Sequence, residues 1–299
     1  MGIVNPKNPA WILCTPLFSL LPSMQSNHPA RGVVPGSRFV LGITFALFAL
    51  APLCVAFAGA ANLQGEDARD RAFAVRALGE AGGADAVASL AVALGDANVF
   101  VRATAMQALH DLGCGPLRQA VIMALEGALT GDNPLARAGA AETLGMLKAE
   151  NVAEALTRLL EDQHARAQHA AACALARVNA KDAAPELIAL ARAAGAGPFA
   201  RMGAVWALGE LRIEQAVAPL LEVIEEGRRG EWNYTSVAVY AVEALGKINA
   251  PASLPRLVSA MSIKDRHLRA QLAVTLSTMT GHDFGQDQEK WKTFLSSGS

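Results

Sequence analysis

The chain contains few aromatic residues. Phe, Trp and Tyr make up 5 % of its 299 residues, although 52 % of the residues are hydrophobic. This composition favours helices that pack through small contacts over a core filled by large rings. The chain also lacks an excess of either charge, with 26 Lys and Arg against 27 Asp and Glu. Nucleic-acid binders are usually basic, because contacts to phosphates dominate their affinity, so we expect no nucleic-acid partner.

The usual signatures of catalytic and metal sites are absent as well. The chain has no Gly-x-Ser-x-Gly turn, no glycine-rich phosphate loop after a strand, no Cys-x-x-Cys and no His-Glu-x-x-His. His164 and His169 are five residues apart, a spacing that does not place them on one helix face. Cys114 lies in an expected interhelical loop, and no motif places a histidine beside it. We therefore expect no catalytic residue, no metal site and no cofactor.

One helix motif, by contrast, occurs seven times. Each copy has an anchor leucine, and the gaps between successive leucines are 31, 35, 31, 33, 37 and 31 residues. Alanine stands four residues before the leucine in six copies, and glycine follows it directly in four. Positions four apart share a helix face, so each helix carries a stripe that alternates small and bulky residues. A period in this range is typical of stacked helical hairpins. The anchor leucines are Leu78, Leu109, Leu144, Leu175, Leu208, Leu245 and Leu276.

A second apolar helix is expected between successive copies, and no strand-like alternation of useful length occurs, so the predicted fold is all-α. Asn133-Pro134 is a helix start, with a capping residue before a proline in the first turn. Four aspartates lie just ahead of motif helices, where we expect them to cap free amides: Asp96, Asp132, Asp162 and Asp265. The predicted second helices are Ala84–Leu94, Leu117–Leu129, Val152–Leu160, Ala183–Ala191, Val217–Ile224 and Leu254–Met261.

The motif copies resemble HEAT repeats, most closely the short, alanine-rich subtype first associated with phycobilisome lyases. The resemblance is carried by segments such as Val101-Arg-Ala-Thr-Ala-Met-Gln-Ala-Leu109 and Ala136-Arg-Ala-Gly-Ala-Ala-Glu-Thr-Leu-Gly145, and it covers about residues 66–280. It implies a right-handed α-solenoid of about seven helical hairpins, with the motif helices on the concave side. It is weak for function, since the family includes scaffolds, adaptors, transport factors and a few enzymes.

The residues after the last motif resemble the closing segment of some bacterial secreted HEAT proteins. They read Gly281-His-Asp-Phe-Gly-Gln-Asp287, followed by Trp291. Terminal repeats must cover an exposed apolar face, and Trp291 and Phe294 can share one helix face to do so. We therefore expect a capping segment at 281–299 after a solenoid at 61–280.

Residues 1–60 form a separate N-terminal region that contains no Asp or Glu. Three basic residues precede an apolar run, Phe39–Ala61, that ends in small residues at cleavage spacing. This pattern predicts an export signal and a periplasmic or secreted protein. The alternative is an uncleaved inner-membrane anchor, since about 20 apolar residues span a bilayer, and it too places the repeats outside the cytoplasm. Residues 1–23 fit a signal poorly, so we expect translation to start near Met24.

Arginine recurs seven residues before the anchor leucine in five copies. If the repeats stack in register, these arginines form a line along one edge. We expect a structural ladder, in which each arginine bonds carbonyls or acidic residues of a neighbouring turn. The alternative is a stripe that binds anions. The arginines are Arg71, Arg102, Arg137, Arg201 and Arg269.

Removal of residues 1–60 leaves two cysteines, Cys114 and Cys173, and 23 Lys and Arg against 27 Asp and Glu, a net charge of −4. Two repeat steps separate the cysteines, which is farther than the roughly 7 Å between Cα atoms that a disulfide allows. Cys173 lies near the alanine stripe, so we expect a small core residue there.

The longest gap between anchor leucines contains an extension at 225–235. Insertions in solenoids fall in loops, often on the binding face, and Trp, Tyr and Arg are enriched at interaction hot spots. Our hypothesis is that Arg228, Arg229, Trp232 and Tyr234 contribute to a partner surface. The alternative is a loop whose tryptophan packs on the adjacent helix.

These features together predict an exported, non-enzymatic scaffold or adaptor that binds a protein or peptide on its concave surface. The rival function, suggested by the repeat subtype alone, is a lyase or lyase accessory subunit that attaches a chromophore to a protein. A domain that binds cell-wall polysaccharide is a third class. Clustered exposed aromatics would mark it, and only Trp232 and Tyr234 qualify in the sequence.

Overall fold

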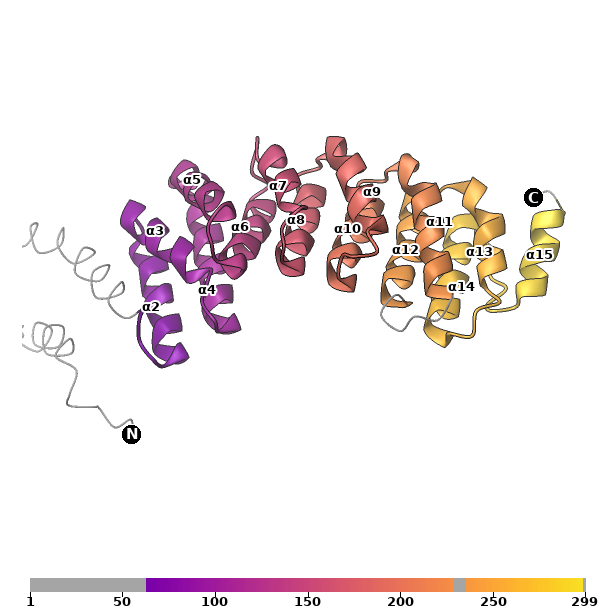
Figure 1. Cartoon of the computed structure of the whole chain (residues 1–299), viewed down its shortest axis with the longest axis horizontal. Coiled ribbons are helices and arrows are strands. Elements are labelled where there is room, and N and C mark those ends of the chain that lie inside the picture. The colour runs from indigo at the N-terminus through magenta and orange to yellow at the C-terminus, as the bar shows by residue number, and fades with distance from the viewer. Residues whose placement is uncertain (1–62, 229–234, 298–299) are drawn as a thin grey trace, which may run out of the picture.

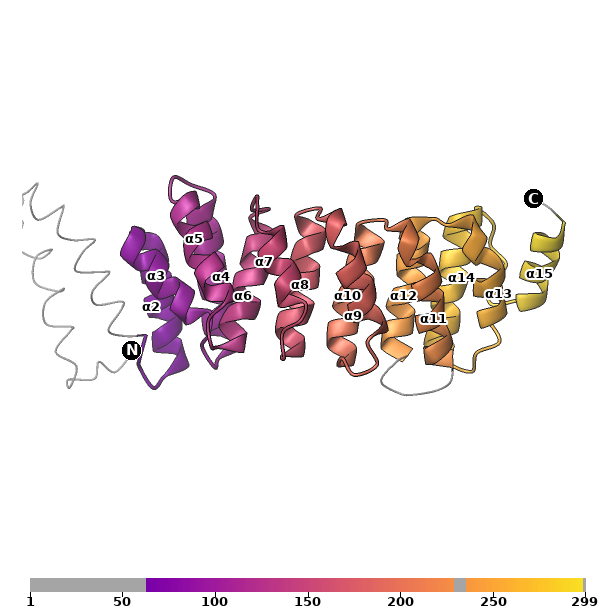
Figure 2. The same ribbon diagram turned by 45° about the horizontal axis from the view of Figure 1, so that its top comes forward.

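The computed structural model describes residues 63–228 and 235–297, and this part is built from fourteen α-helices and three short 3-10 turns, without a strand. The helices stand side by side in one elongated row, from α2 at the N-terminal end to α15 at the other (Figure 1). A view turned by 45° shows the same row (Figure 2). The all-α solenoid predicted from the repeat is confirmed.

The seven motif helices, named anchor helices below, alternate with six second helices. The anchor helices are α2 (Ala68–Ala81), α4 (Val99–Gly113), α6 (Pro134–Met146), α8 (Ala165–Arg177), α10 (Pro198–Glu210), α12 (Thr235–Ile248) and α14 (Arg266–Thr280). The second helices are α3 (Ala84–Ala93), α5 (Arg118–Leu129), α7 (Ala153–Leu159), α9 (Ala184–Arg192), α11 (Val217–Arg228) and α13 (Leu254–Ala260). A 3-10 turn precedes three of these second helices, at Lys181–Ala183, Glu214–Ala216 and Pro251–Ser253.

The alanine and leucine stripe forms the seam between repeats. All seven anchor leucines are at most 1 % exposed, and the six alanines four residues before them are at most 2 % exposed. All of these side chains except that of Ala74 belong to one apolar cluster that runs the length of the stack. Because each repeat contacts mainly its neighbours, stability is distributed along the array and no central core is needed.

Glycine after the anchor leucine allows neighbouring anchor helices to touch. A Cβ on Gly145 would lie 2.8 Å from the Cα of Ala174, and one on Gly209 would lie 2.7 Å from the Cα of Ala244. In both cases the neighbour is the small residue directly before the next anchor leucine. Gly79 makes the same kind of approach to the next repeat. Glycine at these positions is therefore required by helix spacing, since any side chain would overlap the next helix.

The α4–α6 pair departs from this pattern. His110 follows the anchor leucine of α4, and Thr143 takes the place of the facing alanine on α6. Neither side chain is small enough for the glycine–alanine approach. Accordingly, α4 and α6 contact each other less extensively than any other two neighbouring anchor helices.

Several anchor helices are followed, one or two residues after their ends, by a residue in the left-handed backbone region. Lys148, Asn179, Arg212 and Asn249 have φ angles of 47°, 57°, 52° and 56°, and each stands four residues past its anchor leucine. This conformation turns the chain toward the second helix of the repeat. Lysine and arginine have none of the preference of glycine or asparagine for it, so Lys148 and Arg212 occupy strained positions.

The two described ends of the stack differ: a further helix covers the C-terminal end, and the N-terminal end has a polar outer face. At the C-terminal end, α15 (Gln288–Ser296) packs against α13, and its Trp291 is fully buried. The indole Nε1 donates to the carbonyl of Gly285 at 2.9 Å, and Gln288 Nε2 donates to the carbonyl of Val258 at 2.8 Å. At the N-terminal end, Asp70 is exposed at a position that is apolar in the other six copies. A polar outer face of this kind is expected of a terminal repeat.

No helix among residues 63–228 and 235–297 is long and apolar enough to cross a bilayer. The apolar run Phe39–Ala61, on which the export prediction depends, lies outside the described residues.

Candidate functional site

The arginines of the motif connect the loops of consecutive repeats. Arg137 donates from Nε and Nη2 to the two carboxylate oxygens of Asp162, at 2.6 and 2.9 Å. Its Nη1 donates to the carbonyls of Gly131 and Asp132, at 2.8 and 3.0 Å. One guanidinium thus binds the loop before its own helix and the loop before the next anchor helix.

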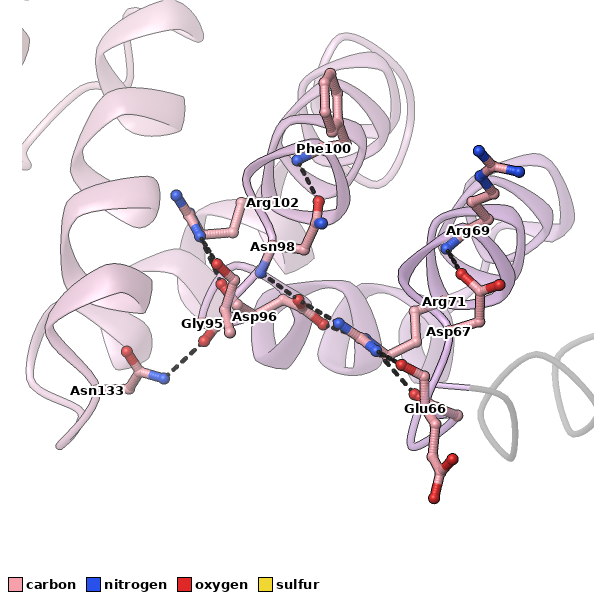
Figure 3. Close-up of polar contacts among 12 residues, drawn as sticks. Glu66, Asp67, Arg69, Arg71, Gly95, Asp96, Asn98, Phe100, Arg102 and Asn133 are labelled. Atoms are coloured by element: carbon pink, nitrogen blue, oxygen red, sulfur yellow. Dashed lines mark hydrogen bonds and ion pairs between the residues drawn. The ribbon is translucent and has the colours of Figure 1, made fainter.

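Arg71 repeats this geometry two repeats earlier in the stack, as Figure 3 shows. Its Nε and Nη2 donate to Asp96 at 2.7 and 2.9 Å, and its Nη1 donates to the carbonyls of Gly65 and Glu66. A hydrogen bond from this guanidinium holds the pKa of the Asp96 carboxyl below its usual range. The pair lies in a part-buried loop, where such charge-assisted bonds are stronger than at an open surface.

Arg201 and Arg269 use other acceptors. The side chain of Arg201 is buried, donates from Nε to the carbonyl of Ala191 at 2.7 Å, and pairs with Glu226 at 2.6 Å. Arg269 donates to the carbonyl of Ile263 and to the side-chain oxygen of Gln286. Each of these two arginines connects its own anchor helix to residues outside that helix, so both also stabilise the packing of adjoining loops and helices.

Arg102 differs from the other four. Its Nη1 donates to the carbonyls of Asp96 and Ala97, at 2.7 and 2.9 Å (Figure 3). It forms no salt bridge within the described part of the chain, because Asp96 is engaged by Arg71. The remaining guanidinium nitrogens of Arg102 therefore have no carboxylate partner among those residues.

The capping role expected of three of the four aspartates, Asp96, Asp132 and Asp162, was wrong. Asp96 and Asp162 accept the arginine bonds and the amides of Asn98 and His164, and neither is the capping residue of the following helix. For α4 that residue is Asn98, whose side chain accepts from the amide of Phe100 at 2.8 Å. Asp96 and Asp162 sit two residues too early to reach the first free amides of the helix.

The other starts are closer to expectation. Asp265 caps α14 by accepting from the amide of Leu268 at 2.8 Å. Asn133, followed by Pro134, caps α6, while Asp132 beside it is not the capping residue. The Asn133 amide also donates to the carbonyl of Gly95 at 2.9 Å (Figure 3), so this cap connects two repeats.

Arg228 is the last residue of α11, whereas Arg229, Trp232 and Tyr234 lie outside the described residues. The partner role of this loop therefore stays a prediction.

A histidine–cysteine pair on α8 was missed by the sequence reasoning. The Sγ of Cys173 lies 3.6 Å from His169 Nε2, and the carbonyl of Phe199 accepts from His169 Nδ1 at 3.0 Å. The imidazole stacks on the Phe199 ring at 4.0 Å between centroids. A Cβ on Gly203 would lie 2.8 Å from Nδ1, so glycine makes room for the ring. Cys173 is half-buried, not the core residue that we expected.

The electrostatics of this pair do not activate the thiol. Burial raises the pKa of Cys173 to about 11 and lowers the pKa of His169. The proton therefore stays on sulfur at neutral pH, and the thiolate that nucleophilic chemistry requires is scarce.

Cys114 also has a histidine neighbour, with its Sγ 3.8 Å from His110 Nε2, although no catalytic motif places one there. Both pairs have the four-residue spacing that places two side chains on one helix face, and this spacing could have identified them. Both cysteines are free. Within the described ranges, no group of three or more His, Cys, Asp and Glu side chains is placed to hold a metal ion.

The exposed surface of the anchor helices is notably apolar. Of the eight large hydrophobic side chains that the described part leaves exposed, six lie on anchor helices and two on second helices. Phe73 on α2 and Phe100 on α4 are 70 % and 75 % exposed. Between α4 and α6 this surface is hollowed into a cleft of about 280 Å³. The anchor-helix layer is therefore the part of the molecule best suited to contact a partner.

Family models match most of the described repeats. The model of HEAT repeats matches residues 59–145 and 153–232, and the model of PBS lyase HEAT-like repeats matches 136–162 and 237–262. No curated protein sequence matches the chain.

Solved structures of Kap121p show the same fold at low identity. Karyopherin Kap121p bound to the extreme C-terminus of the protein phosphatase Cdc14p has a TM-score of 0.63 at 13 % identity, over 81 % of this chain and 31 % of that chain. Kap121p bound to RanGTP has a TM-score of 0.61 at 15 % identity, over 84 % and 32 %. This chain thus spans about a third of that protein. The complex of CpcE and CpcF of phycocyanin lyase from Nostoc sp. PCC7120 has a TM-score of 0.41 at 23 % identity, over 92 % and 99 %.

Proposed function

This chain belongs to the HEAT-repeat family, and we propose that it is a non-enzymatic scaffold that binds a protein or peptide on the surface of its anchor helices. The apolar character of that surface carries the proposal. Exposed phenylalanines lower the solubility of a protein, and aromatic residues are common at the centres of protein interfaces. Phe73 and Phe100 have no role in the core and are available to a partner.

Helix spacing supports a concave location for this surface. Neighbouring anchor helices contact each other more extensively than the neighbouring second helices of the same repeat step do, even at α4–α6. In a curved stack the more closely spaced layer is the inner one. A partner on this layer would meet several repeats at once, and a few anchors would provide most of its affinity.

The polar groups of the repeat support a scaffold over an enzyme. Four of the five motif arginines donate hydrogen bonds to side chains outside their own helices, as Arg137 does to Asp162. Cys173 keeps its proton beside His169 because burial raises its pKa. Neither arrangement provides a nucleophile or an acid–base pair at neutral pH.

A direct test compares two double variants. Phe73→Ser with Phe100→Ser removes the most exposed aromatics of the anchor layer. The matched control, Val92→Ser with Met123→Ser, removes two residues of similar exposure from second helices. The full chain and both variants are used to capture partners from envelope extract of the source cells. A protein captured by the wild type and the control but lost with the phenylalanine variant is the expected result, and identical capture by all three would contradict the function.

The rival lyase function has one observation in its favour, the match of residues 136–162 and 237–262 to the PBS lyase HEAT-like repeat. Such a lyase would bind its chromophore. Purified protein that carries a coloured tetrapyrrole, or that attaches a supplied bilin to a protein, would favour the lyase. Colourless protein that is inert toward bilins would favour the scaffold.

We also propose that the repeats function outside the cytoplasm, in the periplasm or secreted, on the strength of the segment Phe39–Ala61. Cell fractionation with N-terminal sequencing tests this location. A mature N-terminus near Ala61 in the periplasm or medium is expected, and the full chain at the inner membrane would instead indicate an anchor. Cytosolic protein with peptides from upstream of Met24 would contradict both the export and the start site.

A further inference from the structure

The cleft between α4 and α6 has an apolar floor and lies on the anchor-helix surface. Its apolar lining comes from Val99, Ala103 and Met106 of α4 and from Leu135 and Met146 of α6. At about 280 Å³ it is smaller than the roughly 300–1,000 Å³ of a typical small-molecule pocket. It is therefore sized for one or two side chains of a partner chain.

The cleft exists because this seam lacks the glycine–alanine contact. Gly145 and Gly209 bring their helices against the next repeat, whereas His110 stands at the equivalent position of α4. With Thr143 facing it, the two helices cannot close. The limited contact between α4 and α6 thus follows from these two side chains, and another hollow lies between α12 and α14.

More basic than acidic side chains surround the apolar floor. Arg102 and Arg166 line the cleft together with a single carboxylate, Glu142. Arg166 makes no salt bridge with a residue of the described ranges, and Arg102 donates there only to backbone carbonyls. Two cations thus face the cleft without a carboxylate bound to them.

The two cations lie at one end of the cleft. Arg102 and Arg166 belong to the first turns of α4 and α8, whereas Glu142 belongs to the second half of α6. Because the anchor helices run in the same direction, both arginines lie near the N-terminal ends of the helices, where the helix dipoles also favour negative charge. The two ends of the cleft therefore differ in charge: one end is basic and the other is acidic.

We propose that this cleft binds an extended segment of a partner protein in which an apolar side chain is followed or preceded by one carboxylate. The apolar side chain fills the space between Met106 and Leu135, and the carboxylate pairs with Arg102 and Arg166. Glu142 repels a second acidic residue at the far end and so sets the direction of the segment. The inference rests on the proposed scaffold function and specifies the chemistry of its partner.

The probe is a library of random heptapeptides displayed on phage and selected on the full chain. We expect the selected peptides to pair Leu, Met or Phe with Asp or Glu within two residues. A synthetic peptide from the selection then gives dissociation constants by fluorescence anisotropy. Arg166→Glu should weaken it by about tenfold or more, since a charge-assisted bond is replaced by repulsion. Selection on Arg166→Glu should favour Lys or Arg in place of the acid.

A second variant blocks the cleft without changing its charge. Ala103→Phe places a ring over the floor from an exposed position on α4, and it should abolish binding of the selected peptide. The matched control is Ala88→Phe on α3, which makes the same change at an exposed alanine outside the cleft and should leave binding unchanged.

Selected peptides without an acidic preference, or binding that survives Ala103→Phe, would overturn the proposal. Failure to select any peptide would also overturn it. That result would hold whether the occupant of the cleft proved to be a second copy of the chain or residues 1–62. Partner capture that depends on Phe73 and Phe100, combined with peptides that show no acidic preference, would leave the scaffold function standing and reject this site alone.

Discussion

Arg137 and Asp162 lie 25 residues apart and join two consecutive repeats through a two-pronged ion pair, with Nε and Nη2 facing the two carboxylate oxygens. Both side chains are largely buried, at 14 % and 7 % exposure. A planar guanidinium that binds both oxygens of a carboxylate fixes direction as well as distance. Since a solenoid depends on the contact between neighbours, this pair helps to set the angle between successive repeats.

Removal of this carboxylate is expected to destabilise the stack. Asp162→Ala leaves Arg137 part-buried without its partner, and we expect a loss of about 2–4 kcal/mol in the free energy of unfolding. Urea unfolding monitored by circular dichroism measures it. Glu154→Ala is the control, because the Arg158–Glu154 pair is exposed on both sides and should contribute almost nothing. Equal effects of the two substitutions would contradict a structural role for the ladder.

The ladder also predicts how stability depends on pH. The hydrogen bond from Arg71 lowers the pKa of Asp96 in the folded chain. The ionised carboxylate therefore stabilises the fold above the unfolded pKa of aspartate, about 3.9, and this contribution is lost as pH falls through the lower folded value. Melting temperatures of wild type and Asp96→Asn should differ at pH 7 and converge only once the pH has fallen below the folded pKa of Asp96. A difference that persists unchanged into strong acid would reject this linkage.

Glycine at the repeat seam gives a prediction about packing. Gly209→Ala places a Cβ where Ala244 lies 2.7 Å away, so we expect about 1–3 kcal/mol of destabilisation. Gly127→Ala, within α5, meets no atom within 4 Å and should stabilise by up to about 1 kcal/mol through helix propensity. Opposite signs for two identical substitutions in denaturant unfolding are the expected outcome. The same sign for both would show that the helices can move apart at little cost.

Strain at the helix ends can be tested in the same assay. Lys148 has a φ of 47°, which costs a residue with a Cβ about 1 kcal/mol relative to glycine. Lys148→Gly should therefore stabilise the chain, whereas Lys181→Gly, in the turn before α9, should not. Destabilisation by Lys148→Gly would mean that the contacts of the Lys148 side chain stabilise the fold by more than its backbone conformation destabilises it.

The two cysteines should differ in reactivity. Burial raises the pKa of Cys173 to about 11, while Cys114 is exposed. Because the thiolate is the reactive form, iodoacetamide at pH 8 should label Cys114 at least about tenfold faster than Cys173. Mass spectrometry of the labelled peptides gives both rates. Faster labelling of Cys173 would indicate that His169 activates the thiol, and it would revive an enzymatic function.

Much of the architecture could be predicted because it depends on local periodicity. The repeat of leucine and alanine located every anchor helix, and the predicted second helices agree with the observed ones within a few residues except at the C-terminal end of α11. The left-handed ends at Lys148 and Arg212 carried no such signal, since these residue types do not favour that conformation. The His169–Cys173 pair was within reach, because its four-residue spacing is visible in the chain.

The sequence by itself determined the helices, their amphipathic faces and the order of the repeats, because each of these follows from residues less than two helical turns apart. Only the tertiary structure decided which carboxylate each arginine meets, as for Arg71 and Asp96, and where the seam opens, as between α4 and α6. The reason is physical: partners 25 or more residues apart come within bonding distance only after the hairpins have stacked. The spacing of the stack in turn depends on the size of single side chains, such as Gly145 or His110, at the contact.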